Sequence, residues 1–147
     1  MAVTDESGDR PAGESVTNRA WAVVGMAPRA ELLSDVRAGL RGWLAELGLT
    51  DEQIDVIVLC VDEAASNAVE HAYADTTGTI DIRATRAENP DAVMVTVSDR
   101  GSWRTPREHT DRGRGLAMIR ALAGRLDMDT GPAGTTVTMA WPTDAMY

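Results

Sequence analysis

Two stretches in the first half of the chain have apolar residues at helical spacing. From residue 30 to residue 47 an apolar residue recurs every three or four positions, which is typical of a helix with one buried side. Gly48 can end this helix. Thr50 and Gln53 have the spacing of a capping box, so a second helix is predicted to start at 51 and to run to about Ala72.

Strand patterns dominate most of the remaining chain. Residues 20–26 are apolar and β-prone, and Pro28 ends that run. Residues 80–85 alternate between apolar and polar, and residues 93–98 are rich in β-branched side chains. The turn sequence at 89–91 between these two runs predicts that they pair as a hairpin.

The last part of the chain predicts one helix and two more strands. Residues 113–123 have a helical pattern, and Gly124 is the expected stop. Strands are expected at 126–128 and 135–141, around a glycine-rich turn at 131–134. With helices early and hairpins late, we expect an α+β fold: a two-layer sandwich whose mixed, mostly antiparallel sheet has helices on one face.

Length and composition indicate one domain. The chain has 147 residues, of which 44% are apolar, enough for one hydrophobic core. Residues 1–18 have the polar, acidic composition of a disordered tail, which leaves 19–147 as a single domain. No apolar run approaches the ~18 residues of a membrane span, and no signal-peptide pattern opens the chain. We therefore expect a cytoplasmic protein without membrane contact.

Charge and rare residues narrow the function classes. A net charge of −9 disfavours direct binding to nucleic acid. Every basic residue is an arginine, so any basic contact to phosphate must come from arginine. The single cysteine, Cys60, lies in an apolar run and is expected to be a buried thiol. His71 and His109 have no evident chemical partner, and we expect passive positions for both.

Three segments have residues suited to chemistry. Glu63 and Asn67 lie four residues apart on the second predicted helix and share one side of it, with Glu70 nearby. They could equally be ordinary surface residues. Asp99 and Gly101 follow a predicted strand, where a carboxylate can accept a hydrogen bond from an exocyclic amine. The alternative for this pair is a common Asp-x-Gly turn.

The third segment is glycine-rich. Gly113 and Gly115 lead into a predicted helix, whose first N–H groups can bind an anion. Residues 100–114 hold five arginines against two acids, which favours phosphate binding. A solvated loop is the alternative.

In this order and spacing, the segments resemble the GHKL ATPase superfamily, and within it the anti-sigma-factor serine/threonine kinases. Residues 63–73 look like the N box of that branch, 99–101 like the G1 box, and 113–116 like the G2 box. Residues 134–137 are similar to the terminal strand motif. The resemblance covers about residues 19–141 and implies a Bergerat-type ATP-binding fold with ATP and Mg²⁺ as cofactors.

The resemblance also implies a role for each matching position. Glu63 would be the catalytic carboxylate, Asn67 would hold Mg²⁺, and Asp99 would bind the adenine amino group. Gly101 would make room for the base. The implied cofactor-binding residues are Asn67, Asp99, Gly101, Arg112, Gly113, Arg114, Gly115, Leu116, Thr135 and Thr136. One position departs from the family: Trp103 stands where the G1 box often has a second glycine.

By resemblance, the leading hypothesis is an ATP-dependent serine protein kinase that is also an anti-sigma factor. It would phosphorylate a STAS-type antagonist and sequester a sigma factor, and the resemblance also implies a homodimer. The alternative is a nucleotide-binding interaction module without kinase activity. A third hypothesis is the catalytic domain of a histidine kinase, which ranks last because this sequence has no dimerisation helices with an acceptor histidine.

Overall fold

The computed structural model describes residues 19–75, 78–88, 91–100, 110–131 and 134–143, without the side chains of 71–75 and 110–115. The predicted tail at 1–18 and the stretch at 101–109 therefore lie outside the described residues. The strands are β1 (Ala20–Met26), β2 (Ile80–Ala87), β3 (Ala92–Asp99), β4 (Arg125–Gly131) and β5 (Gly134–Pro142). The helices are α1 (Leu33–Glu46), α2 (Asp51–Asp75) and α3 (Thr110–Leu122), and a short 3-10 helix, Ala30–Leu32, precedes α1.

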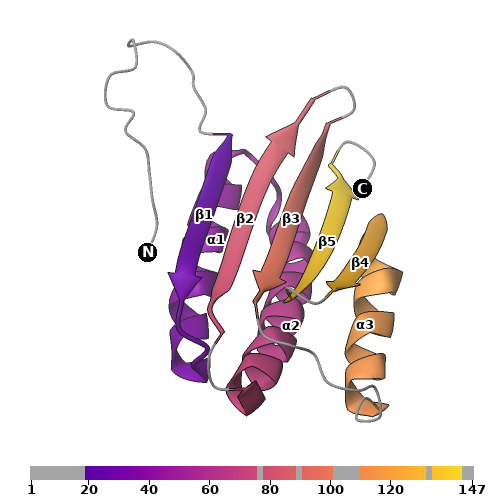
Figure 1. Ribbon diagram of the computed structural model, residues 1–147. Coiled ribbons are helices and arrows are strands. Elements are labelled where there is room, and N and C mark those ends of the chain that lie inside the picture. The colour runs from indigo at the N-terminus through magenta and orange to yellow at the C-terminus, as the bar shows by residue number, and fades with distance from the viewer. Residues whose placement is uncertain (1–18, 76–77, 89–90, 101–109, 132–133, 144–147) are drawn as a thin grey trace.

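The five strands form one sheet in the order β1-β2-β3-β5-β4. Every neighbouring pair in it is antiparallel, so the predicted mixed character of the sheet was wrong. The β2–β3 hairpin is confirmed, with Ala87 opposite Ala92 at its closed end. All three helices lie on one face of the sheet, which confirms the predicted two-layer α+β fold (Figure 1).

The core lies between that face and the helices. Along β3, alternate residues are buried, because successive side chains of a strand point to opposite faces. The largest fully buried apolar side chains are Leu40, Leu44, Ile57, Ile80, Ile82, Ile119, Met139 and Trp141. They come from helices and strands alike, so sheet and helices share one core.

The ends of the first two helices follow the predicted capping chemistry. Thr50 and Gln53 bond reciprocally: Thr50 N–H donates to Gln53 Oε1 at 2.8 Å, and Gln53 N–H donates to Thr50 Oγ1 at 3.1 Å. Gly48 has a φ of 88° and follows the end of α1, as a C-terminal glycine cap should. The second helix continues to Asp75, past the predicted end at Ala72.

The third helix starts earlier than predicted. It begins at Thr110, so Gly113 and Gly115 lie inside α3 and do not lead into it. Only the first few backbone N–H groups of a helix lack partners inside it, so in α3 these free N–H groups belong to the residues near Thr110. The predicted placement of both glycines before the helix was therefore wrong.

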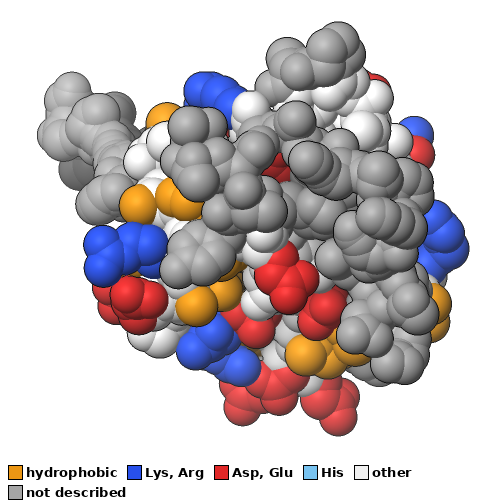
Figure 2. Space-filling view, turned by 60° about the horizontal axis from the view of Figure 1, so that its bottom comes forward, with side chains coloured by type: hydrophobic (Ala, Val, Ile, Leu, Met, Phe, Trp, Pro, Cys, Tyr) orange, Lys and Arg blue, Asp and Glu red, His pale blue; other side chains and the backbone are white. Residues whose placement is uncertain are grey.

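Acidic side chains gather near the lower centre of the surface shown in Figure 2, in keeping with the net charge of −9. In the ranges that the structure describes, no helix combines the length and apolar character that a bilayer crossing requires.

Candidate functional site

A row of four side chains, three of them polar, crosses one end of the sheet on the helix-covered face. In the strand register Ile80 lies opposite Asp99, Asp99 opposite Thr135, and Thr135 opposite Thr130. Asp99 is 4% exposed and Thr135 is 2% exposed. A buried carboxylate next to a buried hydroxyl is costly for an apolar core, which marks this end of the sheet as a candidate site.

Helix α2 brings a third polar side chain to the same place. Asn67 is buried, and Ala64 and Ala68 lie beside it on the side of α2 that packs against the sheet. These small residues let the helix lie close to the strands. Residues of α2, α3, β3, β4 and β5 line a cavity of about 10 Å³, which is room for about one water molecule. It is lined by Ala64, Asn67, Ala68, Val97, Asp99, Leu116, Met128, Thr135 and Val137.

One polar atom in this cavity is unsatisfied. The Oγ1 atom of Thr135 is buried and has no hydrogen-bond partner within the described part of the chain. Leaving a buried hydroxyl unpaired costs about 1–3 kcal/mol. A ligand with a hydrogen-bonding edge would remove that cost, so the cavity has the chemistry of a binding site that its own residues do not complete.

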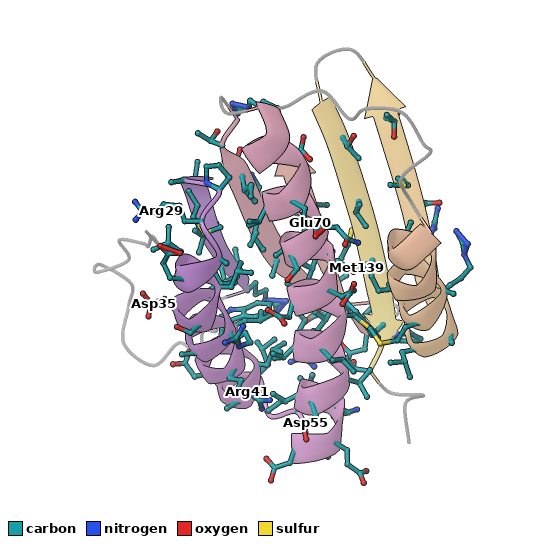
Figure 3. All side chains as sticks on the ribbon, turned by 90° about the horizontal axis from the view of Figure 1, so that it is seen from below. Arg29, Asp35, Arg41, Asp55, Glu70 and Met139 are labelled. Atoms are coloured by element: carbon teal, nitrogen blue, oxygen red, sulfur yellow. The ribbon has the colours of Figure 1, made fainter. Side chains whose placement is uncertain are left out.

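Glu63 lies near this cavity without lining it. It is half-buried on α2, one helical turn before Asn67. Its neighbour Asp62 turns toward α1, where Arg37 Nη1 contacts Asp62 Oδ1 at 2.9 Å. Two turns earlier, Asp55 pairs with Arg41 of α1 at 2.9 Å (Figure 3). Since adjacent helix residues project about 100° apart, Glu63 leaves α2 on a different side from Asp62.

The two threonines predicted for the site, Thr135 and Thr136, lie on opposite faces of the sheet. Thr135 faces the cavity, whereas Thr136 lies on the opposite face of the sheet because side chains alternate along a strand. There its Oγ1 lies 3.1 Å from Ser98 Oγ. Thr135 therefore shares the cavity with Asp99, whereas Thr136 lies with Ser98 on the other face of the sheet.

Gly134 lets the ends of β3 and β5 lie very close together. Its φ is 141°, and a Cβ atom on it would collide with the carbonyl oxygen of Asp99. Arg100, the next residue after Asp99, turns to the outer face and pairs with Asp81 at 3.4 Å. Any side chain at position 134 would therefore disturb the backbone that carries Asp99.

Of the predicted glycine-rich segment, the structure places Leu116 in the cavity wall. The side chains of Arg112 and Arg114 and all of Gly101 lie outside the described residues. Sequence reasoning missed Met128 and the two valines, Val97 and Val137, which also line the cavity. Val97 lies two residues before Asp99 on β3, so the alternation rule could have found it.

The single cysteine takes no part in this site. Cys60 is fully buried, as predicted, and burial raises the pKa of its thiol to about 11. A thiol with so high a pKa is almost entirely protonated near neutral pH and is a poor nucleophile.

The chain is similar to known kinases. Residues 26–141 match the family described as "Histidine kinase-like ATPase domain". Sensor histidine kinase DesK of Bacillus subtilis (strain 168) is 33% identical over 107 residues, which are 70% of this chain and 27% of DesK. Serine-protein kinase RsbW of Bacillus licheniformis is 34% identical over 74 residues, or 50% of this chain and 45% of RsbW.

A solved structure supports the same assignment. The RsbU and RsbW domains of Rv1364c from Mycobacterium tuberculosis superpose with a TM-score of 0.69 at 31% identity, over 84% of this chain and 32% of that one. The chain thus spans under half the length of each of these relatives.

Proposed function

Since the chain belongs to the histidine kinase-like ATPase family, we propose that it is an ATP-dependent serine protein kinase that also sequesters a sigma factor. The observation that carries this proposal is the meeting of Asn67, Asp99 and Thr135 in one buried cavity. The similarity to RsbW favours serine as the phosphorylated residue. The chain covers part of each relative, so the kinase activity and the partners are proposals for this protein.

The polar residues of the cavity fit an adenine base. The carboxylate of Asp99 can accept a hydrogen bond from an exocyclic amine, and the hydroxyl of Thr135 can pair with a ring nitrogen. Val97 and Val137 offer an apolar wall to a flat ring. When bound, ATP supplies the phosphoryl group that the reaction transfers. The unsatisfied hydroxyl of Thr135 supports a ligand of this kind.

Asn67 and Glu63 suit the other end of such a nucleotide. A carboxamide oxygen on Asn67 is a hard ligand of the kind that Mg²⁺ prefers, and one protein ligand is enough when phosphates and waters complete the octahedron. Glu63, one turn away on α2, would orient the attacking serine hydroxyl. Phosphoryl transfer depends mainly on positioning and charge neutralisation, so one carboxylate for the nucleophile is sufficient.

The expected partners are proteins. A phosphate added to a STAS-type antagonist would bring about two negative charges to an interface with this acidic chain. Repulsion would then release the antagonist and free this protein to hold its sigma factor. The acidic surface in Figure 2 supports protein partners over nucleic acid.

The test is phosphate transfer from Mg-ATP to the serine of a STAS-type partner. Glu63→Gln should abolish transfer and leave nucleotide binding intact, since Glu63 does not line the cavity. Glu52→Gln, an exposed acid on the first turn of the same helix, is the matched control and should keep transfer. Binding is followed by the rise in melting temperature with Mg-ATP.

One observation favours the alternative of a binding module without catalysis: Glu63 stands outside the cavity wall. In that case Mg-ATP would stabilise the protein, and Glu63→Gln and the wild type would both leave every cognate STAS partner unphosphorylated. Autophosphorylation on histidine would instead support the third hypothesis, which the similarity to DesK keeps open.

A further inference from the structure

The cavity is too small for the ligand that its polar groups fit. It has room for about one water molecule, and a purine base is several times larger. Part of the wall must therefore move before a base can reach Asp99 and Thr135. This inference rests on the proposed function, since it concerns how that site is opened.

Most of the wall is buried and belongs to the core. Val97 and Val137 lie on β3 and β5, which are paired on both sides, and are at most 5% exposed. On the helix side, Ala64 and Ala68 are each 3% exposed and carry the smallest side chain that an ordinary residue has. Moving either wall would separate the sheet from α2 and expose the core.

Met128 differs from these residues in its place in the sheet and in its exposure. It lies on β4, a strand that is paired on one side only, and it is 37% exposed. Its partner across the strands is Val137, so its side chain covers the cavity from the open edge of the sheet. Figure 1 shows β4 at that edge with α3 beside it. Leu116 of α3 completes this side and is half-buried.

We propose that Met128 controls access to the base site: its side chain fills the space that the ring takes and swings outward to admit it. Methionine suits this task because it is unbranched, has three rotatable bonds and packs well against aromatic rings. Its exposed position lets the side chain move into solvent without disturbing a neighbour on β4. After binding, the thioether would lie against the ring.

The association rate of a fluorescent ATP analogue, measured by stopped flow, tests this proposal. If the open arrangement is populated about a tenth of the time, Met128→Ala should raise the association rate constant about tenfold. Met128→Val, which suits a strand and leaves a smaller side chain, should give an intermediate increase and guards against a poorly folded alanine variant. Met94→Ala is the control, because Met94 is 41% exposed on β3 and does not line the cavity.

The outcomes separate this proposal from the proposed function. Association rates for both Met128 variants equal to that of Met94→Ala overturn it, as does a change confined to the dissociation rate, which would make Met128 merely a packing surface. Binding by Met128→Ala alone, with none by the wild type, supports it strongly. Absence of nucleotide binding in all variants and in the wild type overturns the proposed function and this inference together.

Discussion

The two faces of one sheet end differ sharply, although they are built from adjacent residues. On the inner face Asp99 and Thr135 are buried, and the hydroxyl of Thr135 has no hydrogen-bond partner among the described residues. On the outer face Ser98 and Thr136 are partly exposed, and their hydroxyls bond to each other at 3.1 Å. The inner face, which has the unpaired hydroxyl, is therefore the face where a ligand could add a hydrogen bond.

The outer face also contains a carboxylate, that of Asp81, whose hydrogen bonds stabilise the fold. Asp81 accepts the N–H of Gly25 at 2.7 Å and the guanidinium of Arg100 at 3.4 Å. The first bond holds the irregular part of β1, where the register shifts between Val23 and Met26. These contacts give Asp81 a role within the fold, whereas the proposed function assigns Asp99 to the ligand, although both lie at the same end of the sheet.

Among these substitutions, the largest loss of stability is expected at Gly134, at the end of β5 beside Asp99. Gly134→Ala would force a side chain into the carbonyl of Asp99 at a φ of 141°. Strain at such a position alone costs about 1–3 kcal/mol, and the collision adds to it. We expect a loss of about 3 kcal/mol or more in the free energy of unfolding, measured by urea denaturation.

Gly131→Ala is the matched control, because a Cβ atom at position 131 meets open space. It should cost less than about 1 kcal/mol, as an ordinary glycine replacement in a strand end does. Equal losses for the two variants would show that the close approach of Gly134 to Asp99 is not a constraint on this sheet.

The next largest effect is a change in Kd for Mg-ATP, and it should distinguish Asp99 from Asp81. Asp99→Asn should weaken Mg-ATP binding by about 2–3 kcal/mol, or roughly 30- to 150-fold in Kd, since a hydrogen bond to a charged acceptor is lost. Asp81→Asn keeps an oxygen for Gly25 and loses only the ion pair with the exposed Arg100, so Kd should change less than about twofold. Isothermal titration calorimetry measures both; a comparable rise in Kd for both would remove the distinction between the faces.

Much of this fold could be predicted from the sequence, because local patterns agreed with tertiary needs. The capping box at Thr50 and Gln53 and the glycine after α1 depend on neighbours within a few residues, and both were confirmed. The alternation along β3 likewise predicts which residues face the helices. Asn67, Asp99 and Thr135 then meet because α2 crosses the sheet above them.

The errors have equally local causes. The start of α3 was predicted at Gly113 because glycines often precede helices, but the preceding polar residues from Thr110 also adopt helix. Met128 was missed because its place depends on β4 pairing with β5, which puts it opposite Val137. Such long-range register cannot be predicted from a strand of seven residues with mostly exposed side chains.

The smallest and sharpest comparison is between the two adjacent threonines. Thr135→Val removes a hydroxyl that has no partner in the described structure, so the free energy of unfolding should stay level or rise by up to about 1 kcal/mol. The same change should weaken nucleotide binding by about 0.5–1.5 kcal/mol, or roughly 2- to 12-fold in Kd.

Thr136→Val should do the reverse. It breaks the bond to Ser98 and should lower the free energy of unfolding by about 0.5–1 kcal/mol, without changing Kd. Urea denaturation and calorimetry on the same two proteins give both quantities. Because the two substitutions are chemically identical and one residue apart, a general effect of valine on β5 would move both variants in the same direction. If the free energy of unfolding falls for Thr136→Val but not for Thr135→Val, and Kd rises only for Thr135→Val, ligand binding is assigned to the inner face. If both variants lose stability equally, the hydroxyl of Thr135 stabilises the fold and is not reserved for a ligand.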